Sequence, residues 1–166
     1  MERSLALLLL VVGTLLVPSP ANSATETVHD RYNRSAPAQN LKNARFSYNE
    51  RSVVVRIKME HLSKDRTVLV SKYLRRDGTT IQVVTKYVRG NKRVLVSGYD
   101  EESVEAISVD LAHATWDFRR DTVRIWIGDE LLRGRRASFL AWSQEKGAMH
   151  GNHFGDSAYV ANLDRG

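Results

Sequence analysis

The chain has 166 residues, no cysteine and a formal net charge of +6 at pH 7. Without cysteine there is no disulfide, no thiol nucleophile and no cysteine zinc cluster, so a folded domain must depend on its hydrophobic core for stability. The positive charge favours anionic partners such as cell-wall polymers, acidic glycans or nucleic acid, and it is equally typical of a solvated basic surface.

Residues 1–23 have the layout of a secretory signal peptide. A short polar start with Arg3 precedes an apolar run over residues 5–17, and small residues then suit a cleavage site after Ser23, with Ala24 as the close alternative. The apolar run is shorter than the roughly 20 residues needed to span a bilayer. We therefore predict a secreted, extracellular protein with no membrane span in its mature form.

Residues 24–166 are predicted to hold one domain, because a chain of this size can bury about two-thirds of its unfolded surface in a single core. Residues 24–43 are polar and contain Pro37. They predict a loosely structured leading segment that can supply an edge strand, followed by a single β-sandwich domain over residues 44–166.

From residue 44 onward the hydrophobic pattern has a period of two, which predicts strands with one buried face. In SVVVRIKME (52–60), Val53, Val55, Ile57 and Met59 share one face, and polar residues such as Arg56 and Lys58 lie on the other. Further strands rich in β-branched residues are expected at 67–74, 79–88, 93–100, 105–111, 122–128 and 137–143.

Turn residues separate these runs. Asp77-Gly78 and Gly90-Asn91 predict hairpin turns, and a third turn is expected between Phe118 and Thr122. Apart from a single helical turn expected within residues 129–136, no helical pattern interrupts the strands. The sequence therefore predicts an all-β, antiparallel two-sheet β-sandwich, jelly-roll-like in outline.

Two stretches, ARFSYNERSVVVRIKMEHL (44–62) and ATWDFRRDTVRIWIGDELL (114–132), occur in that order around paired hairpin strands. They resemble a group of small secreted β-sandwich proteins of actinobacteria, which are similar in outline to jelly-roll domains of DOMON and carbohydrate-binding-module type. The resemblance implies a β-sandwich fold and secretion, and it implies no particular ligand. Relatives often carry a cysteine near the GDELL position, which this chain lacks.

Aromatic side chains on polar strand faces are the candidate ligand-binding residues. Alternation along residues 122–128 places Trp126 on the polar face with Arg124, and the same reasoning places Tyr99 and Tyr73 outside the main core. Flat rings beside charged groups can stack on sugar rings. Alternatively, loops or the other sheet cover these rings and they simply pack. If the protein binds a glycan, Trp126 is the first candidate.

His150, His153 and Asp156 lie in the glycine-rich run GAMHGNHFGDS near the end of the chain. Their spacing supplies imidazole and carboxylate donors that could ligate a divalent ion if the run folds back on itself. Zinc motifs usually hold their ligands on a helix or a knuckle, whereas three glycines favour a flexible connection. The sequence therefore favours a loop between the last strands, with a metal site as the alternative.

No catalytic motif is present, so we expect a protein that is not an enzyme. The acids Asp100, Glu101, Glu102 and Glu105 are close in sequence, and glycoside hydrolysis needs two carboxylates, but this cluster precedes a strand and is typical of a charged connection. No cofactor is expected. For haem in particular, neighbouring methionine and histidine residues do not present ligands to opposite faces of one iron.

The function that these observations favour is an exported, non-enzymatic binding or surface-interaction module for a glycan, cell-wall polymer or other anionic polymer. The alternatives are a structural secreted domain without a small ligand and a glycoside hydrolase. A nucleic-acid partner is not expected, because the arginine clusters at 75–76, 119–120 and 133–136 lack interleaved aromatic residues. No oligomeric state follows from the sequence.

Overall fold

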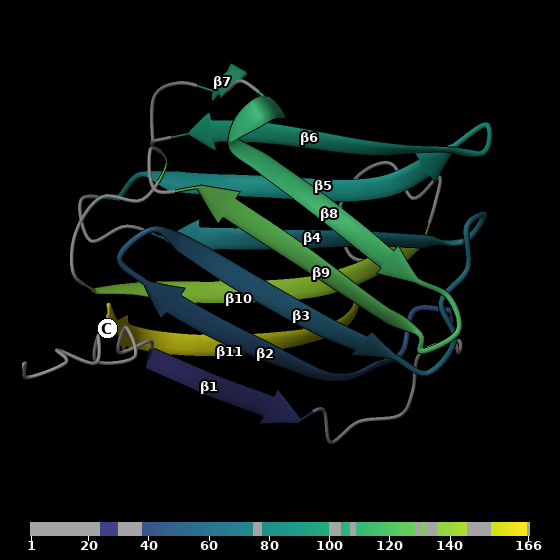
Figure 1. The fold of residues 1–166 in the computed structure, drawn as a ribbon, viewed down its shortest axis with the longest axis horizontal. Helices are drawn as coiled ribbons and strands as arrows, with labels where there is room; N and C mark the ends of the chain where they lie inside the picture. Colours follow the sequence, from purple (N-terminus) through teal and green to yellow (C-terminus); the bar gives the residue numbers. More distant parts are fainter. Residues whose placement is uncertain are drawn as a thin grey trace, which may run out of the picture.

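The computed structural model is a sandwich of two antiparallel sheets (Figure 1). It describes residues 24–29, 38–74, 78–99, 104–106, 109–128, 131, 136–145 and 154–165. The five-stranded sheet pairs its strands in the order β1 (Ala24–His29), β2 (Leu41–Asn49), β3 (Ser52–Met59), β9 (Thr122–Gly128) and β8 (Ala112–Asp117). The six-stranded sheet has the order β11 (Phe154–Asp164), β10 (Arg136–Glu145), β4 (Thr67–Leu74), β5 (Thr80–Val88), β6 (Asn91–Tyr99) and β7 (Val104–Ala106). The predicted two-sheet antiparallel β-sandwich is confirmed.

Most of the predicted strands occur where the sequence placed them, and those at 67–74 and 122–128 match β4 and β9 at both ends. The strand predicted at 105–111 is wrong: the chain instead forms the short strand β7 and a 3-10 turn, η1 (Val109–Leu111). Within the predicted leading segment, β1 is the edge strand, and β2 begins three residues before the expected domain boundary.

Residues 1–23, for which we predict a signal peptide, lie outside the described residues. Among the residues that are described, no helix combines the length and apolar character that a membrane crossing requires.

The hairpin between β5 and β6 shows how local sequence sets the register. Arg89 and Gly90 have φ angles of 50° and 78°, as both central residues of a type I′ turn require. Val88 pairs with Asn91, so the turn consists of Arg89 and Gly90 rather than the predicted Gly90-Asn91. The predicted turn between Phe118 and Thr122 is confirmed, because β8 ends at Asp117 and β9 begins at Thr122.

Two sets of hydrogen bonds hold the hairpin between β2 and β3, one within the turn and one from Arg165. The Asn49 side-chain oxygen accepts hydrogen bonds from the backbone N–H groups of Arg51 and Ser52, each at 2.9 Å. From the C-terminal end of the chain, the Arg165 guanidinium donates to the carbonyl of Asn49 at 3.2 Å and to that of Glu50. These bonds fix the tight turn, and the turn fixes which residues of β2 and β3 lie opposite each other.

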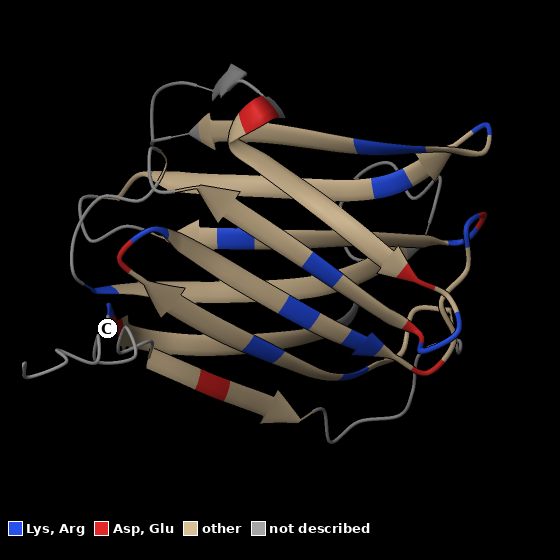
Figure 2. Cartoon of the chain, in the orientation of Figure 1, with Lys and Arg blue, Asp and Glu red and all other residues tan. Residues whose placement is uncertain are grey.

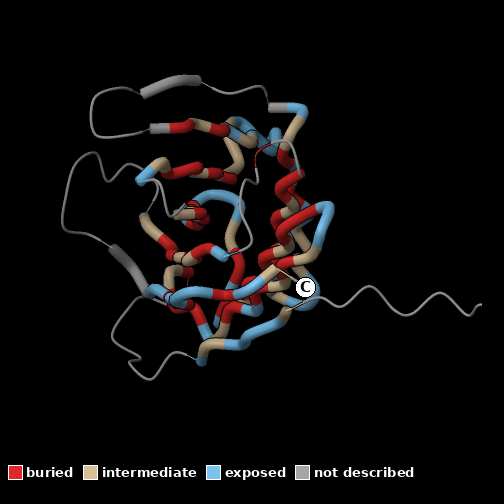
Figure 3. The backbone as a smooth tube through the Cα atoms, turned by 90° about the vertical axis from the view of Figure 1, so that its left-hand side faces the viewer, coloured by how far each residue is buried: buried red, intermediate tan, exposed pale blue. Residues whose placement is uncertain are grey.

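The core is centred on Phe139 of β10, which contacts three other aromatic rings between the sheets. Its ring centroid lies 5.9 Å from Phe46 and 5.5 Å from Tyr48, both on β2, and 5.4 Å from Tyr73 on β4. All four side chains are fully buried. The buried segments accordingly face each other between the two layers (Figure 3). One cluster thus joins β2 of the five-stranded sheet to β4 and β10 of the six-stranded sheet.

A second aromatic cluster, Tyr87, Trp116 and Phe118, packs against this core near the β8–β9 turn. The Trp116 indole N–H donates to the buried Thr85 hydroxyl at 3.0 Å, which satisfies its one polar group. The Lys64 ammonium lies 5.1 Å from the Phe118 ring centroid, within cation–π range. Trp116 and Phe118 are partly buried and extend the core toward the β8–β9 turn.

Truncating Phe139, the central ring of the first aromatic cluster, should destabilise the protein. We expect Phe139→Ala to lower the free energy of unfolding by about 3–5 kcal/mol, because it removes a buried ring and leaves a cavity between the sheets. Urea unfolding followed by circular dichroism measures this. Tyr159→Ala is the matched control, since Tyr159 is 55% exposed, and it should change the stability by less than about 0.5 kcal/mol. A similar loss in both variants would contradict the central role of Phe139.

Candidate functional site

The outer face of the five-stranded sheet carries two neighbouring rows of side chains that cross the strands. Each strand alternates inward and outward residues, so side chains from paired positions form a line across the sheet. The register gives one line as Thr27, Arg45, Arg56, Arg124 and Thr115, and the next as Thr25, Ser47, Val54, Trp126 and His113.

We call Arg45, Arg56 and Arg124 the arginine row. Arg45 lies directly opposite Arg56 on the neighbouring strand, and Arg56 lies directly opposite Arg124. All three side chains are exposed. Figure 2 shows their blue segments side by side across β2, β3 and β9. Like charges placed directly opposite each other destabilise a sheet, so this arrangement lowers stability unless a ligand or partner neutralises it.

Within the part of the chain that the structure describes, no carboxylate forms an ion pair with the arginine row. The ion pairs there are Arg120 with Asp117 and Arg136 with Asp164. The second pair joins β10 to β11 through two hydrogen bonds, of 2.6 and 3.0 Å. These hydrogen bonds from Arg136 lower the pKa of the Asp164 carboxyl, and the same contact raises the pKa of the guanidinium.

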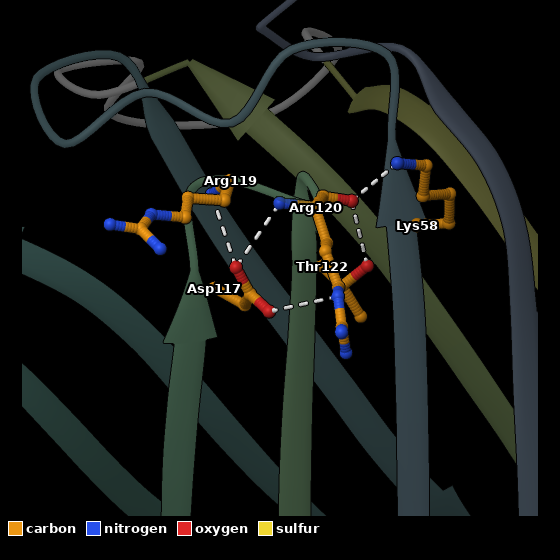
Figure 4. A network of polar contacts seen from close by, with 5 residues as sticks. All are labelled: Lys58, Asp117, Arg119, Arg120 and Thr122. Carbon is orange, nitrogen blue, oxygen red and sulfur yellow. Dashed lines mark hydrogen bonds and ion pairs between the residues drawn. The ribbon is translucent and has the colours of Figure 1, made fainter.

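Asp117, an acid that lies on this face with Arg56 and Arg124, is engaged by the β8–β9 turn (Figure 4). One of its oxygens accepts the backbone N–H groups of Arg119 and Arg120, each at 3.1 Å, and the other lies 3.8 Å from the Arg120 guanidinium. The Arg120 carbonyl accepts hydrogen bonds from the Thr122 hydroxyl at 2.9 Å and from the Lys58 ammonium. The network thus ties the turn to β3 and adds cations beside the arginine row.

Two shallow depressions adjoin the arginine row. One, of about 340 Å³, is lined by Arg45, Ser47, Asn49, Val54, Arg56 and Arg124. The other, of about 300 Å³, is lined by Arg56, Thr115, Trp116, Asp117, Arg120, Thr122 and Arg124. Arg56 and Arg124 line both of them, so a ligand lying across the face could contact the two guanidinium groups from either side.

Trp126 stands in the neighbouring row, stacked on His113. The ring centroids are 4.8 Å apart and the planes differ by 20°, so the two rings stack across β9 and β8. Gly128 follows Trp126 on the same face, and a Cβ at this position would come within 2.8 Å of the indole. On the other side of β9, the residue opposite Trp126 is Val54, which is too short to cover an indole.

The four predicted ligand-binding residues do not all lie on one surface. Trp126 and Arg124 lie together on the outer face, as alternation predicted, with Arg124 exposed and Trp126 half-buried. The prediction for Tyr73 is wrong, because its ring is fully buried in the aromatic core. Tyr99 is the last residue of β6, and its side chain lies outside the described residues.

The candidate metal ligands His150 and His153 lie outside the described residues, as does the side chain of Asp156, whose backbone belongs to β11. Among the side chains that the structure does describe, no group of three histidines or acids gathers closely enough to hold a metal ion. Of the acidic cluster, Asp100, Glu101 and Glu102 are outside the described residues, and so is the side chain of Glu105.

No protein-family model matches this chain, and no curated protein sequence matches it. The candidate site is therefore defined by its geometry alone.

The sequence did not identify Arg45, Arg56 and His113 as site residues. The signals that could have found them are the two tight hairpins, because the β2–β3 turn sets Arg45 opposite Arg56 and the β8–β9 turn sets His113 opposite Trp126.

Removing the central charge of the arginine row should stabilise the protein. We expect Arg56→Gln to raise the free energy of unfolding by about 0.5 kcal/mol at low ionic strength, because two like-charge pairs disappear. The gain should fade in 1 M salt, where the Debye length is only about 3 Å and repulsion between exposed charges is largely screened. Arg56→Lys keeps the charge and is the control, with no gain expected. Urea unfolding at both salt concentrations measures this, and a destabilised Arg56→Gln would contradict the repulsion.

The position of the Trp126 ring can be tested through its glycine neighbour. We expect Gly128→Ala to displace the indole, because the new methyl group would lie inside its van der Waals contact. The stack on His113 should weaken, and the ring-current shift of the imidazole protons in an NMR spectrum should decrease. Thr27→Ala, at the far edge of the same face, is the control. Unchanged His113 signals in Gly128→Ala would disprove the stacked arrangement.

Proposed function

We propose that the protein is an exported, non-enzymatic binding module that attaches to a glycan or cell-wall polymer through the outer face of the five-stranded sheet. The observation that carries this proposal is the pairing of a stacked aromatic, Trp126 on His113, with a row of exposed arginines on one open face. Export is supported by the signal-peptide layout of residues 1–23.

The chemistry of this face suits a sugar polymer. One face of the indole stacks on His113, and the other offers a flat apolar platform for the C–H face of a sugar ring. Arginine donors and the hydroxyls of Ser47 and Thr115 line the neighbouring depressions, where they can hydrogen-bond to sugar oxygens. Stacking supplies affinity, and the polar groups orient the ring.

Two alternatives are less well supported. A structural domain without a ligand has no use for three like charges that lower its own stability. A glycoside hydrolase needs two carboxylates on either side of one bond, whereas the lining of the two depressions contains a single acid, Asp117, which the β8–β9 turn already engages. Binding without hydrolysis is therefore the function that we propose.

The test is retention on insoluble polysaccharides. We expect Trp126→Ala to lose most of the retention, because the stacking platform disappears, while its fold is unchanged by circular dichroism. Tyr159→Ala is the matched control: it removes an exposed aromatic ring from the other sheet and should bind as the unaltered protein does. Equal retention of both variants and the unaltered protein would rule out the proposed surface.

A further inference from the structure

We infer that the ligand is an acidic polysaccharide whose chain crosses the strands along the arginine row, with successive carboxylates held by Arg45, Arg56 and Arg124. This inference rests on the proposed function and names the chemical class of its ligand. The arginine row carries three positive charges, and no described acid forms an ion pair with them.

The spacing of the row favours a polymer over a small anion. Neighbouring strands lie about 4.8 Å apart, so three arginines on three adjacent strands form a line of positive charge about 10 Å long. A single carboxylate or phosphate group can be bonded by one or two guanidinium groups of such a line. A linear chain with an acidic group on each residue can engage all three at once, and it neutralises both like-charge pairs.

The surroundings of the row support a chain that runs across the sheet. The two depressions adjoin the row and share Arg56 and Arg124, which places these two guanidinium groups within reach of a ligand in either depression. Exposed hydroxyls continue the line at both edges, from Thr27 on β1 and Thr115 on β8. Arginine binds carboxylates through two parallel hydrogen bonds, so each position can fix both the charge and the orientation of an acidic group.

The aromatic content of the face favours a glycan over a nucleic acid. Proteins that bind single-stranded nucleic acid stack successive bases on successive aromatic side chains. Here Trp126 and His113 stack on each other beside the arginine row. Trp116, which lines one of the depressions, packs against Tyr87 and Phe118 and donates its indole N–H to Thr85. Among the described rings, this leaves one stacking position next to several cationic ones. An acidic sugar polymer needs this combination of one ring platform and repeated positive charges.

The experiment compares two forms of one polymer by isothermal titration calorimetry. Polygalacturonate carries a carboxylate on every residue, and its fully methyl-esterified form has the same backbone without the charges. We expect the protein to bind polygalacturonate, to bind the ester much more weakly, and to lose affinity as sodium chloride is raised. Arg56→Gln should weaken binding to polygalacturonate about tenfold, as for a lost charge-assisted bidentate contact.

The matched control is Arg93→Gln, which removes the same charge from an exposed arginine on the outer face of the six-stranded sheet and should leave the affinity unchanged. Circular dichroism shows that both variants are folded. Three results would overturn the inference: equal affinity for the ester, equal affinity of Arg56→Gln and Arg93→Gln, or tighter binding to an oligothymidylate or to phosphatidylserine vesicles.

The two proposals fail in different ways. If retention on neutral polysaccharides persists and depends on Trp126, but the charge of the polymer has no effect, the acidic ligand is wrong and the glycan-binding face stands. If no polysaccharide is retained, charged or neutral, both proposals are wrong. Binding of free galacturonate as tight as that of the polymer would also overturn the inference, because it would make the length of the arginine row irrelevant.

Discussion

The contact between the inner faces of the two sheets is the constraint on which the other features depend. With no cysteine in the chain, burial of apolar side chains between the sheets is what joins them, and the ring of Phe139 sits where three other aromatic side chains meet. Because strand residues alternate between faces, committing one set of side chains to this core leaves the other set on the outside. The outer face of the five-stranded sheet is therefore free to evolve without disturbing the core.

The arginine row shows what that freedom allows. Three like charges in register oppose folding, and the described residues provide no acid to offset them, in contrast to Arg136, which is paired with Asp164. Other polar side chains take part in local hydrogen bonds: Asn49 fixes one turn and Asp117 another, and the Lys92 ammonium donates to the Ala114 carbonyl on the edge strand β8 at 2.5 Å. A local arrangement of side chains that opposes folding points to a function that needs it.

The alternation of apolar and polar residues predicts which side chains face the core more accurately in a strand with one buried face than in a strand that is buried on both faces. It placed Trp126 and Arg124 correctly, since the aliphatic residues of β9, Val123, Ile125 and Ile127, all lie on one face. In β4 it failed for Tyr73, because Val68 and Val70 on the opposite face are buried as well, so the period of two gave no reason to choose between the faces. A strand that is covered on both sides can be recognised from sequence, but which of its residues belong to the main core cannot.

The arginine row could not be predicted for a different reason. The hairpin turns set the pairing of β2 with β3 and of β8 with β9, and both pairings lie within short stretches of sequence. The pairing of β3 with β9 joins segments more than sixty residues apart, and it depends on how the two sheets pack rather than on any turn. This non-local contact brings Arg56 beside Arg124 and turns two local pairs into one continuous surface. A site of this kind exists only in the assembled sheet, because each half, taken alone, is an ordinary polar strand face.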